Sequence, residues 1–314
     1  MKKYFAEHPT LSQVLFFIMV IICLVGWISP PIALLSGFLF AELIGHPFLQ
    51  LNSKATAQLL KICVVCLGFG IDLTTAIEAG KDGFLFTIAT ILITIGLGLF
   101  FGKLLKVNKQ TTHLISSGTA ICGGSAIAAV APVINASDRD ISISLGIVFM
   151  LNSVGLFLFP ILGHAFNLTQ HEFGLWSAIA IHDTSSVVGA ATTFGEEALQ
   201  TATVVKLARA LWIIPLAIVT AFVFRAKGKS VKIPWFILWF VLAIAINSYV
   251  TQISEITPHV VAAARKGLVL TLFLIGAGLS IKRIKEVGWK PLLLGIILWF
   301  VISTVSLIVI KNFM

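Results

Sequence analysis

Apolar residues run along this chain in eleven long blocks, which short polar stretches separate. Most blocks approach the 20 or so residues that a helix needs to cross about 30 Å of hydrocarbon. They are continuous rather than alternating, which predicts helices and not the strands of a closed barrel. The blocks cover roughly residues 11–28, 31–45, 55–72, 83–103, 111–135, 140–163, 172–192, 201–224, 233–249, 259–281 and 289–310. We therefore expect an all-α polytopic membrane protein of about 10–11 transmembrane segments, forming one domain over residues 1–314.

The composition agrees with this expectation. Of the 314 residues, 58% are hydrophobic and 11% are charged, against roughly 25% charged residues in soluble domains. The excess apolar surface must face lipid. The net charge of +9 then reports membrane topology and not nucleic-acid binding, because Lys and Arg collect in the cytoplasmic loops of membrane proteins.

The distribution of Lys and Arg predicts the orientation. With a cytoplasmic N-terminus and alternating segments, fourteen lie inside, at positions 2, 3, 54, 103, 106, 109, 225, 227, 229, 232, 282, 283, 285 and 290, and five outside, at 81, 139, 265, 266 and 311. This bias predicts a multi-pass protein of a bacterial inner membrane with its C-terminus outside. Blocks 111–135 and 172–192 could each cross fully or dip in and return, since either path leaves the main basic loops where they are.

Two stretches of the chain resemble each other at a constant offset of 208 residues. The positions Gly68, Gly70, Glu78, Gly80 and Leu85 match Gly276, Gly278, Glu286, Gly288 and Leu293. Under the predicted topology, the first copy runs outward and the second runs inward. Such an inverted repeat is a mark of many secondary transporters.

A glycine pair interrupts block 111–135, where the chain reads SSGTAICGGS from Ser116 to Ser125. Glycine destabilises a helix interior by about 1 kcal/mol relative to alanine. We therefore expect a helix that breaks near the bilayer midplane, although close packing through small residues would also explain the glycines. A break would leave the amides of Gly124 to Ile127 at a helix start, where anions bind. The candidate substrate-binding residues here are Cys122, Gly123, Gly124 and Ser125.

A second polar interruption, HDTSS, lies inside block 172–192. Ionisable residues within an apolar segment are costly and usually functional. His182 titrates near neutral pH when unperturbed, and Asp183 beside it could carry a coupling proton or bind a cation. We take these two as ion-coupling candidates and Thr184, Ser185 and Ser186 as substrate-binding candidates. A purely structural cap, with Asp183 bonded to backbone amides, is the alternative.

Lys206 and Arg209 lie within the apolar block 201–224, three positions apart and so on one face of a helix. A cationic face inside the membrane suits an anionic substrate, or a buried acid such as Asp183. The alternative is that both side chains snorkel to the membrane surface.

Motifs for enzymatic chemistry are missing from the sequence, which has no Walker loop, HExxH or GxSxG. We therefore expect neither an enzyme nor a bound cofactor or metal, and transport would be driven by an ion gradient.

Three motifs resemble a known family. They are GTAICGGSAIAAVAPVI (Gly118–Ile134), AIHDTSSVVGAA (Ala180–Ala191) and VVKLARALWIIPLA (Val204–Ala217). Together they look like the bacterial conserved-hypothetical membrane proteins named as sulfate exporters. That family is grouped with the sodium/proton antiporter and bile-acid:sodium symporter superfamily. The resemblance covers nearly the whole chain and implies a panel and a core, broken helices in the core, an elevator-like sliding of one part, and assembly as a homodimer.

These observations predict a secondary active transporter of a small anion of the sulfate or sulfonate class. The half-helix ends and Arg209 would hold the anion, and His182 with Asp183 would couple its movement to protons or Na⁺. The alternatives are a cation/proton antiporter of the same fold, with Asp183 as ion ligand, and a membrane protein that transports nothing.

Overall fold

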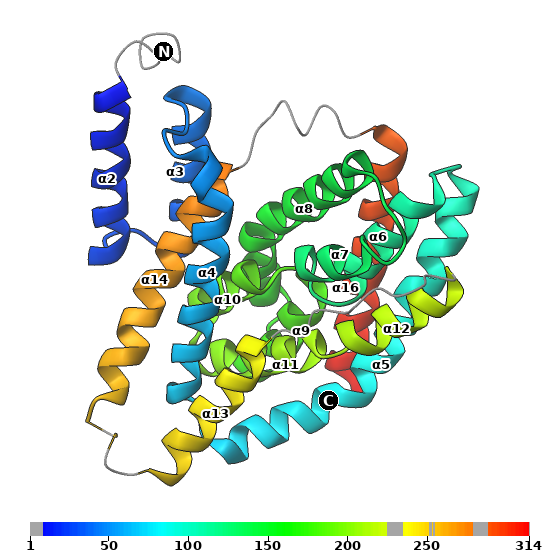
Figure 1. Ribbon diagram of the computed structural model, residues 1–314. Helices are drawn as coiled ribbons and strands as arrows, with labels where there is room; N and C mark the ends of the chain where they lie inside the picture. Colours follow the sequence, from blue (N-terminus) through cyan, green and yellow to red (C-terminus); the bar gives the residue numbers. More distant parts are fainter. Residues whose placement is uncertain (1–8, 225–234, 251–252, 254, 279–287, 314) are drawn as a thin grey trace.

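The chain folds as a bundle of helices. The computed structural model describes residues 9–224, 235–250, 253, 255–278 and 288–313, apart from the side chains of residues 53, 75 and 78–85, and no strand occurs among them (Figure 1). The helices are α2 (Pro9–Val25), α3 (Pro30–Leu43), α4 (Leu49–Leu67), η1 (Gly68–Gly70), α5 (Leu73–Leu104), α6 (Lys109–Ala120), α7 (Gly124–Val130), α8 (Asp138–Ala165), α9 (Gln170–Ala180), α10 (Thr184–Phe194), α11 (Glu196–Ala210), α12 (Ile213–Val223), α13 (Trp235–Tyr249), α14 (Thr257–Gly278) and α16 (Trp289–Phe313).

The eleven apolar blocks of the sequence are confirmed as helices, mostly to within a few residues. Helix α5 is the largest exception, because it begins ten residues before the predicted position 83. Its start is fixed by Asp72, whose Oδ2 accepts a hydrogen bond from the amide of Thr74 (2.9 Å). Three blocks each contain two helices, which are the pairs α6–α7, α9–α10 and α11–α12.

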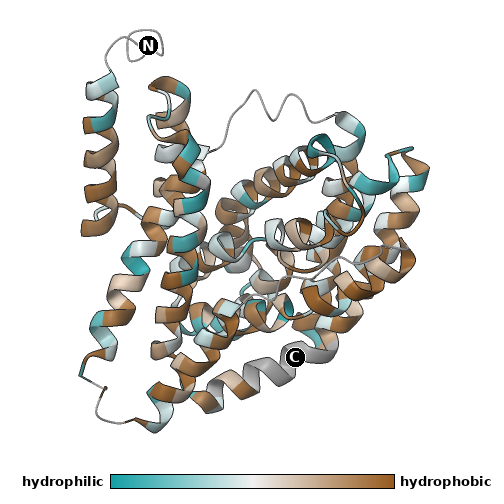
Figure 2. Cartoon of the chain, in the orientation of Figure 1, coloured by the Kyte–Doolittle hydropathy of each residue, from teal (hydrophilic) through white to brown (hydrophobic). Residues whose placement is uncertain are grey.

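The described residues contain six apolar stretches that are long enough to cross a membrane and three shorter apolar helices. Six helical stretches, 49–70, 86–104, 138–165, 196–223, 257–278 and 289–313, are long and apolar enough to span a bilayer. The shorter apolar helices α2, α3 and α13 are the other three. Many outward-facing residues of the bundle are hydrophobic (Figure 2). Phe222 on α12, for example, is largely exposed, as lipid-facing residues are.

The helices form two groups that lie side by side (Figure 1). In the α14 group, which contains α2, α3, α4, α13 and α14, helix α14 packs against α2, α3 and α4. A Cβ atom on Gly276 would lie only 2.0 Å from the carbonyl oxygen of Leu34, so glycine permits the close approach of α14 to α3. The hairpin group contains α6 to α12 together with α5 and α16, and it holds most of the polar motifs.

Helices α4 and α14, which lead into the two copies of the sequence repeat, run in opposite directions and pack against each other. Asn52, near the start of α4, donates from Nδ2 to the carbonyl oxygen of Leu274, near the end of α14 (2.8 Å). Cys63, near the end of α4, lies against Gly267 in the middle of α14. Helices α4 and α14 are therefore antiparallel, as an inverted repeat requires, and the inverted relation of the copies themselves stays a prediction. Glu286 and the predicted basic positions 2–3, 225–232 and 282–285 lie outside the described residues.

Candidate functional site

Helices α6 and α7 form a hairpin that enters and leaves on the same side. The base of the hairpin is closed by Asp140 in the first turn of α8, whose Oδ1 accepts bonds from Asn108 Nδ2 (2.9 Å) and Thr111 Oγ1 (2.7 Å). Asn108 caps the start of α6. The entry and exit of block 111–135 are thus neighbours, which makes the block re-entrant and not a crossing.

The tip of this first hairpin is the glycine pair. Helix α6 ends at Ala120, and the amide of Gly123 donates back to the carbonyl of Gly118 (2.8 Å). Gly123 has φ +61°, a value that favours glycine. The predicted helix break is confirmed here. One detail is corrected, because the amide of Ile127 donates to the carbonyl of Gly123 (3.2 Å) and so is not free.

Helices α9 and α10 form the second hairpin, which is also re-entrant. Its base is closed by the stacked rings of Phe173 and Phe194, whose centroids are 3.8 Å apart. Gln170, at the start of α9, accepts a hydrogen bond on Oε1 from the amide of Glu197, just beyond α10 (3.1 Å). The second hairpin therefore returns to the side from which it entered.

Helix α8 places the two hairpins on opposite sides. It begins at the base of the first hairpin and ends at Ala165, just before the second. Its 28 residues extend about 42 Å at 1.5 Å per residue, enough to cross a bilayer. Half-way along α8, Asn152 is 2% exposed and accepts on Oδ1 from the amides of His182 (2.9 Å) and Asp183 (3.4 Å). The second tip therefore lies at mid-depth, where Asn152 bonds it to α8.

The two tips touch each other. A Cβ atom on Gly123, in the first tip, would lie 3.5 Å from the backbone carbonyl carbon and the Cβ atom of His182, in the second tip. His182 is fully buried, and neither ring nitrogen has a hydrogen-bond partner among the described residues. Two hairpins that enter from opposite sides thus meet end to end near the middle of the protein.

Lys206 joins the two tips. It is 0% exposed, and its Nζ atom donates to the backbone carbonyls of Ile121 (3.1 Å) in the first tip and of Ala178 (3.2 Å) and Ile181 (2.7 Å) in the second. These are among the last carbonyl groups of α6 and α9, which have no partner within their own helices and carry partial negative charge. The ammonium group satisfies both helix ends at once.

Arg209 closes the first tip more locally. It is also 0% exposed, and its Nε (2.8 Å) and Nη2 (2.5 Å) atoms both donate to the carbonyl of Ala120. Its Nη1 donates to Thr90 Oγ1 on α5 (3.1 Å). Full burial excludes the snorkelling alternative for Arg209, and for Lys206 as well. In the second tip, Trp299 Nε1 supplies a further donor to the carbonyl of Ala180 (3.0 Å).

The remaining candidates surround the tips with different exposures. Asp183 is half-buried and caps α10, accepting on Oδ2 from the amide (3.1 Å) and the hydroxyl of Ser185. The cap predicted as an alternative role for Asp183 is therefore present. Cys122 and Ser186 are buried, Gly124 and Thr184 are half-buried, and Ser125 is exposed. The structure thus gathers the sequence candidates at one place, and their roles as ligands or coupling groups stay predictions.

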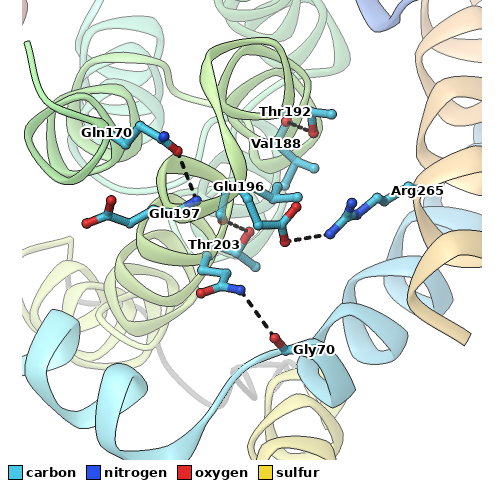
Figure 3. Close-up of polar contacts among 10 residues, drawn as sticks. Gly70, Gln170, Val188, Thr192, Glu196, Glu197, Thr203 and Arg265 are labelled. Atoms are coloured by element: carbon cyan, nitrogen blue, oxygen red, sulfur yellow. Dashed lines mark hydrogen bonds and ion pairs between the residues drawn. The ribbon is translucent and has the colours of Figure 1, made fainter. Parts of the chain in front are cut away.

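Polar contacts also link the two helix groups, as Figure 3 shows. Arg265 on α14 forms an ion pair with Glu196 at the start of α11 (2.5 Å), and Gln200 Nε2 donates to the carbonyl of Gly70 (3.4 Å). A cleft lies between η1, α11 and α14 beside these contacts. Sequence reasoning did not select Glu196 or Gln200, and it counted Arg265 only as a topology signal, because their partners are distant in the chain.

Comparison with known proteins gives one consistent result. The family model described as "Conserved hypothetical protein 698" matches residues 15–295. A UPF0324 membrane protein of Photobacterium profundum is 50% identical over 297 residues, covering 94% of this chain and 91% of that protein. Those of Bacteroides thetaiotaomicron (49% identical; 90% and 86% covered) and Shewanella oneidensis (48% identical; 98% of both chains) carry the same name. No solved structure matches the chain.

Proposed function

Because the chain belongs to the conserved hypothetical protein 698 family of bacterial membrane proteins, we propose that it is a secondary active transporter of a small anion. The substrate class is that of sulfate or a sulfonate. The architecture supports a carrier, since irregular backbone at membrane depth is tolerated where it is buried in protein or lines a polar cavity. Transporter sites commonly lie near the midplane at such broken helices.

The positive charge at the point where the two tips meet is the main support for this proposal. Lys206 and Arg209 contribute two positive charges there, and Asp183 contributes one negative charge. Each tip also contains one helix C-terminus and one helix N-terminus, whose partial charges of roughly −0.5 and +0.5 cancel. The net charge of this region is therefore positive, and in a medium of low dielectric it attracts an anion.

The half-buried residues at the tips are the ones that a solute could reach. Gly124, Thr184 and Asp183 are half-buried and Ser125 is exposed, so amides and hydroxyls from both tips are available to oxygen atoms of a tetrahedral anion. Asp183 is the group proposed to carry the coupling proton, with His182 buried beside it. The N-terminus is proposed to be cytoplasmic. Re-entry of the first hairpin moves Arg139 to the inner side, which changes the count of Lys and Arg to fifteen inside and four outside.

Transport into proteoliposomes tests the proposal. Purified protein would be reconstituted and the uptake of labelled sulfate and of an alkyl sulfonate measured with and without a proton gradient. We expect saturable uptake of at least one of them, and loss of its pH dependence in Asp183→Asn. Ser153→Ala is the matched control, because Ser153 bonds only within its own helix, to the carbonyl of Phe149.

Two results would contradict this function. Proton-driven movement of Na⁺ or Li⁺ without any anion, abolished in Asp183→Asn, would favour a cation/proton antiporter. An unchanged pH dependence in Asp183→Asn would leave Asp183 as a helix cap only.

A further inference from the structure

Three carbonyl oxygens from two separate hairpins converge on one point in the protein interior. They belong to Ile121 in the first tip and to Ala178 and Ile181 in the second, and all lie 2.7–3.2 Å from Lys206 Nζ. The chain separates the two contributing segments by more than fifty residues. Converging carbonyl oxygens repel each other, and a cation with three donors placed between them offsets this repulsion.

The chemistry of the three oxygens is that of a monovalent-cation site. Rings of backbone carbonyls replace the hydration shell of an alkali ion in proteins that bind it. In broken-helix transporters, unwound carbonyls and half-helix C-terminal ends hold the coupling ion. In this protein the same kind of oxygen set surrounds an ammonium, which is a compact, strongly hydrated point charge.

We propose that the carbonyls of Ile121, Ala178 and Ile181 form a monovalent-cation site that the ammonium group of Lys206 permanently occupies. The protein supplies its own cation, so the tips stay joined without a dissolved ion. It follows that transport needs no Na⁺ or K⁺ at this position, a consequence that rests on the proposed transport function. The cation site itself does not rest on that function.

Arg209 provides the internal comparison. Its guanidinium binds one carbonyl, that of Ala120, and one hydroxyl, that of Thr90. Both partners belong to the first tip or to α5, so Arg209 does not bridge the two hairpins. The planar guanidinium makes two of its contacts with a single oxygen, so its removal would not leave a set of oxygens that could surround a simple ion. Removing Arg209 should therefore create no ion site.

Residues close to Ile121 in the chain are less buried than the site itself. Gly124, three residues beyond Ile121, is half-buried, and Ser125 is exposed. The distances from Nζ suit NH₄⁺, methylammonium and K⁺, whereas Na⁺ would require the carbonyls to move inward.

Thermal unfolding of the purified protein in different salts tests the inference. For the wild type, we expect the same unfolding temperature in KCl, NaCl, NH₄Cl and choline chloride at equal ionic strength. For Lys206→Ala, we expect a lower temperature in choline chloride and a saturable rise of about 2–4 °C with NH₄⁺, methylammonium or K⁺. Arg209→Met should lose stability but show no such rise. Lys206→Ser, which also removes the ammonium group and leaves its position empty, is the second variant if Lys206→Ala does not fold.

Either of two results would overturn the inference. One is a wild-type protein that Na⁺ or K⁺ stabilises in a saturable way, because the cage would then hold a free ion. The other is that neither Lys206 variant is stabilised by any of these cations. Failure of transport in proteoliposomes would contradict the proposed function but would leave these unfolding results intact, so the two hypotheses can fail separately.

Discussion

The contact between Asn152 and the second hairpin gives a sharp energetic prediction. In Asn152→Leu the side chain keeps a similar size but loses the Oδ1 acceptor for the amides of His182 (2.9 Å) and Asp183 (3.4 Å). The first bond is of ordinary length and the second is long, so the loss amounts to one good hydrogen bond and one weak bond. Leaving a buried donor unpaired costs about 1–3 kcal/mol. Interhelical bonds in membrane proteins average about 0.6 kcal/mol, which places the expected loss near the lower end of that range.

The assay is unfolding of the purified protein in detergent, with Ser153→Ala as the control. Ser153 bonds to Phe149 one turn earlier in the same helix, so its removal should change the free energy of unfolding by less than about 0.5 kcal/mol. Hydrogen exchange supplies a local measurement, because the amides of His182 and Asp183 should exchange faster in Asn152→Leu. If Asn152→Leu is as stable as Ser153→Ala and exchange at the tip is unchanged, α8 does not hold the second hairpin.

Three further predictions concern packing, topology and motion. Gly276→Ala places a Cβ atom against the backbone of α3 and should destabilise the protein by about 1–3 kcal/mol. The control Gly96→Ala has open space around the new Cβ atom and should be neutral or slightly stabilising. Equal unfolding temperatures of the two variants would contradict the close approach of α3 and α14. In a cysteine-free background, Arg139→Cys should react with an impermeant maleimide from the cytoplasmic side, and labelling only from outside would mean that the first hairpin crosses the membrane. A disulfide between Glu196→Cys and Arg265→Cys should stop transport until it is reduced if the two helix groups slide, and undiminished uptake in the oxidised protein would show that they do not.

The elements of the fold could be predicted from the sequence because each has a local cause. Continuous apolar blocks give the spans, and polar signals give their ends. Ser137 and Asp140 form a capping box at the start of α8, and Thr169 and Glu172 form one at the start of α9. The break at Gly123 was also predictable, since glycine at φ +61° avoids the strain that a side chain would meet there.

The path of the two broken blocks could not be predicted. Each re-entrant hairpin has the apolar composition of a crossing segment, and the positive-inside bias is nearly the same for both paths. The hydrogen bond from Asn108 to Asp140 (2.9 Å) shows that the first hairpin is re-entrant, but it joins residues 32 positions apart. Nothing in the local pattern of the chain indicates that pairing.

The hydrogen-bond partners of Lys206 and Arg209 could not be predicted from the sequence either. The sequence suggested that Lys206 and Arg209 pair with an anionic substrate or with Asp183, because a sequence identifies charged side chains as partners but not particular backbone groups. In the structure, the ammonium group of Lys206 donates hydrogen bonds to three backbone carbonyls. Every residue has a carbonyl group, so its use as a partner depends only on where helices end in space.

The bridge made by Lys206 has a mechanical consequence. Because one side chain on α11 is bonded to both tips, a hairpin that swung open alone would have to break charge-assisted hydrogen bonds worth about 1.5–3 kcal/mol each. The polar contacts between the helix groups include an ion pair whose side chains are 39% and 54% exposed, and exposed pairs contribute little. They also include the long hydrogen bond from Gln200 to the carbonyl of Gly70 (3.4 Å). We therefore expect the interface between the two groups to separate more easily than the two tips. Thermal motion should divide the protein there into two rigid parts and leave the hairpins coupled.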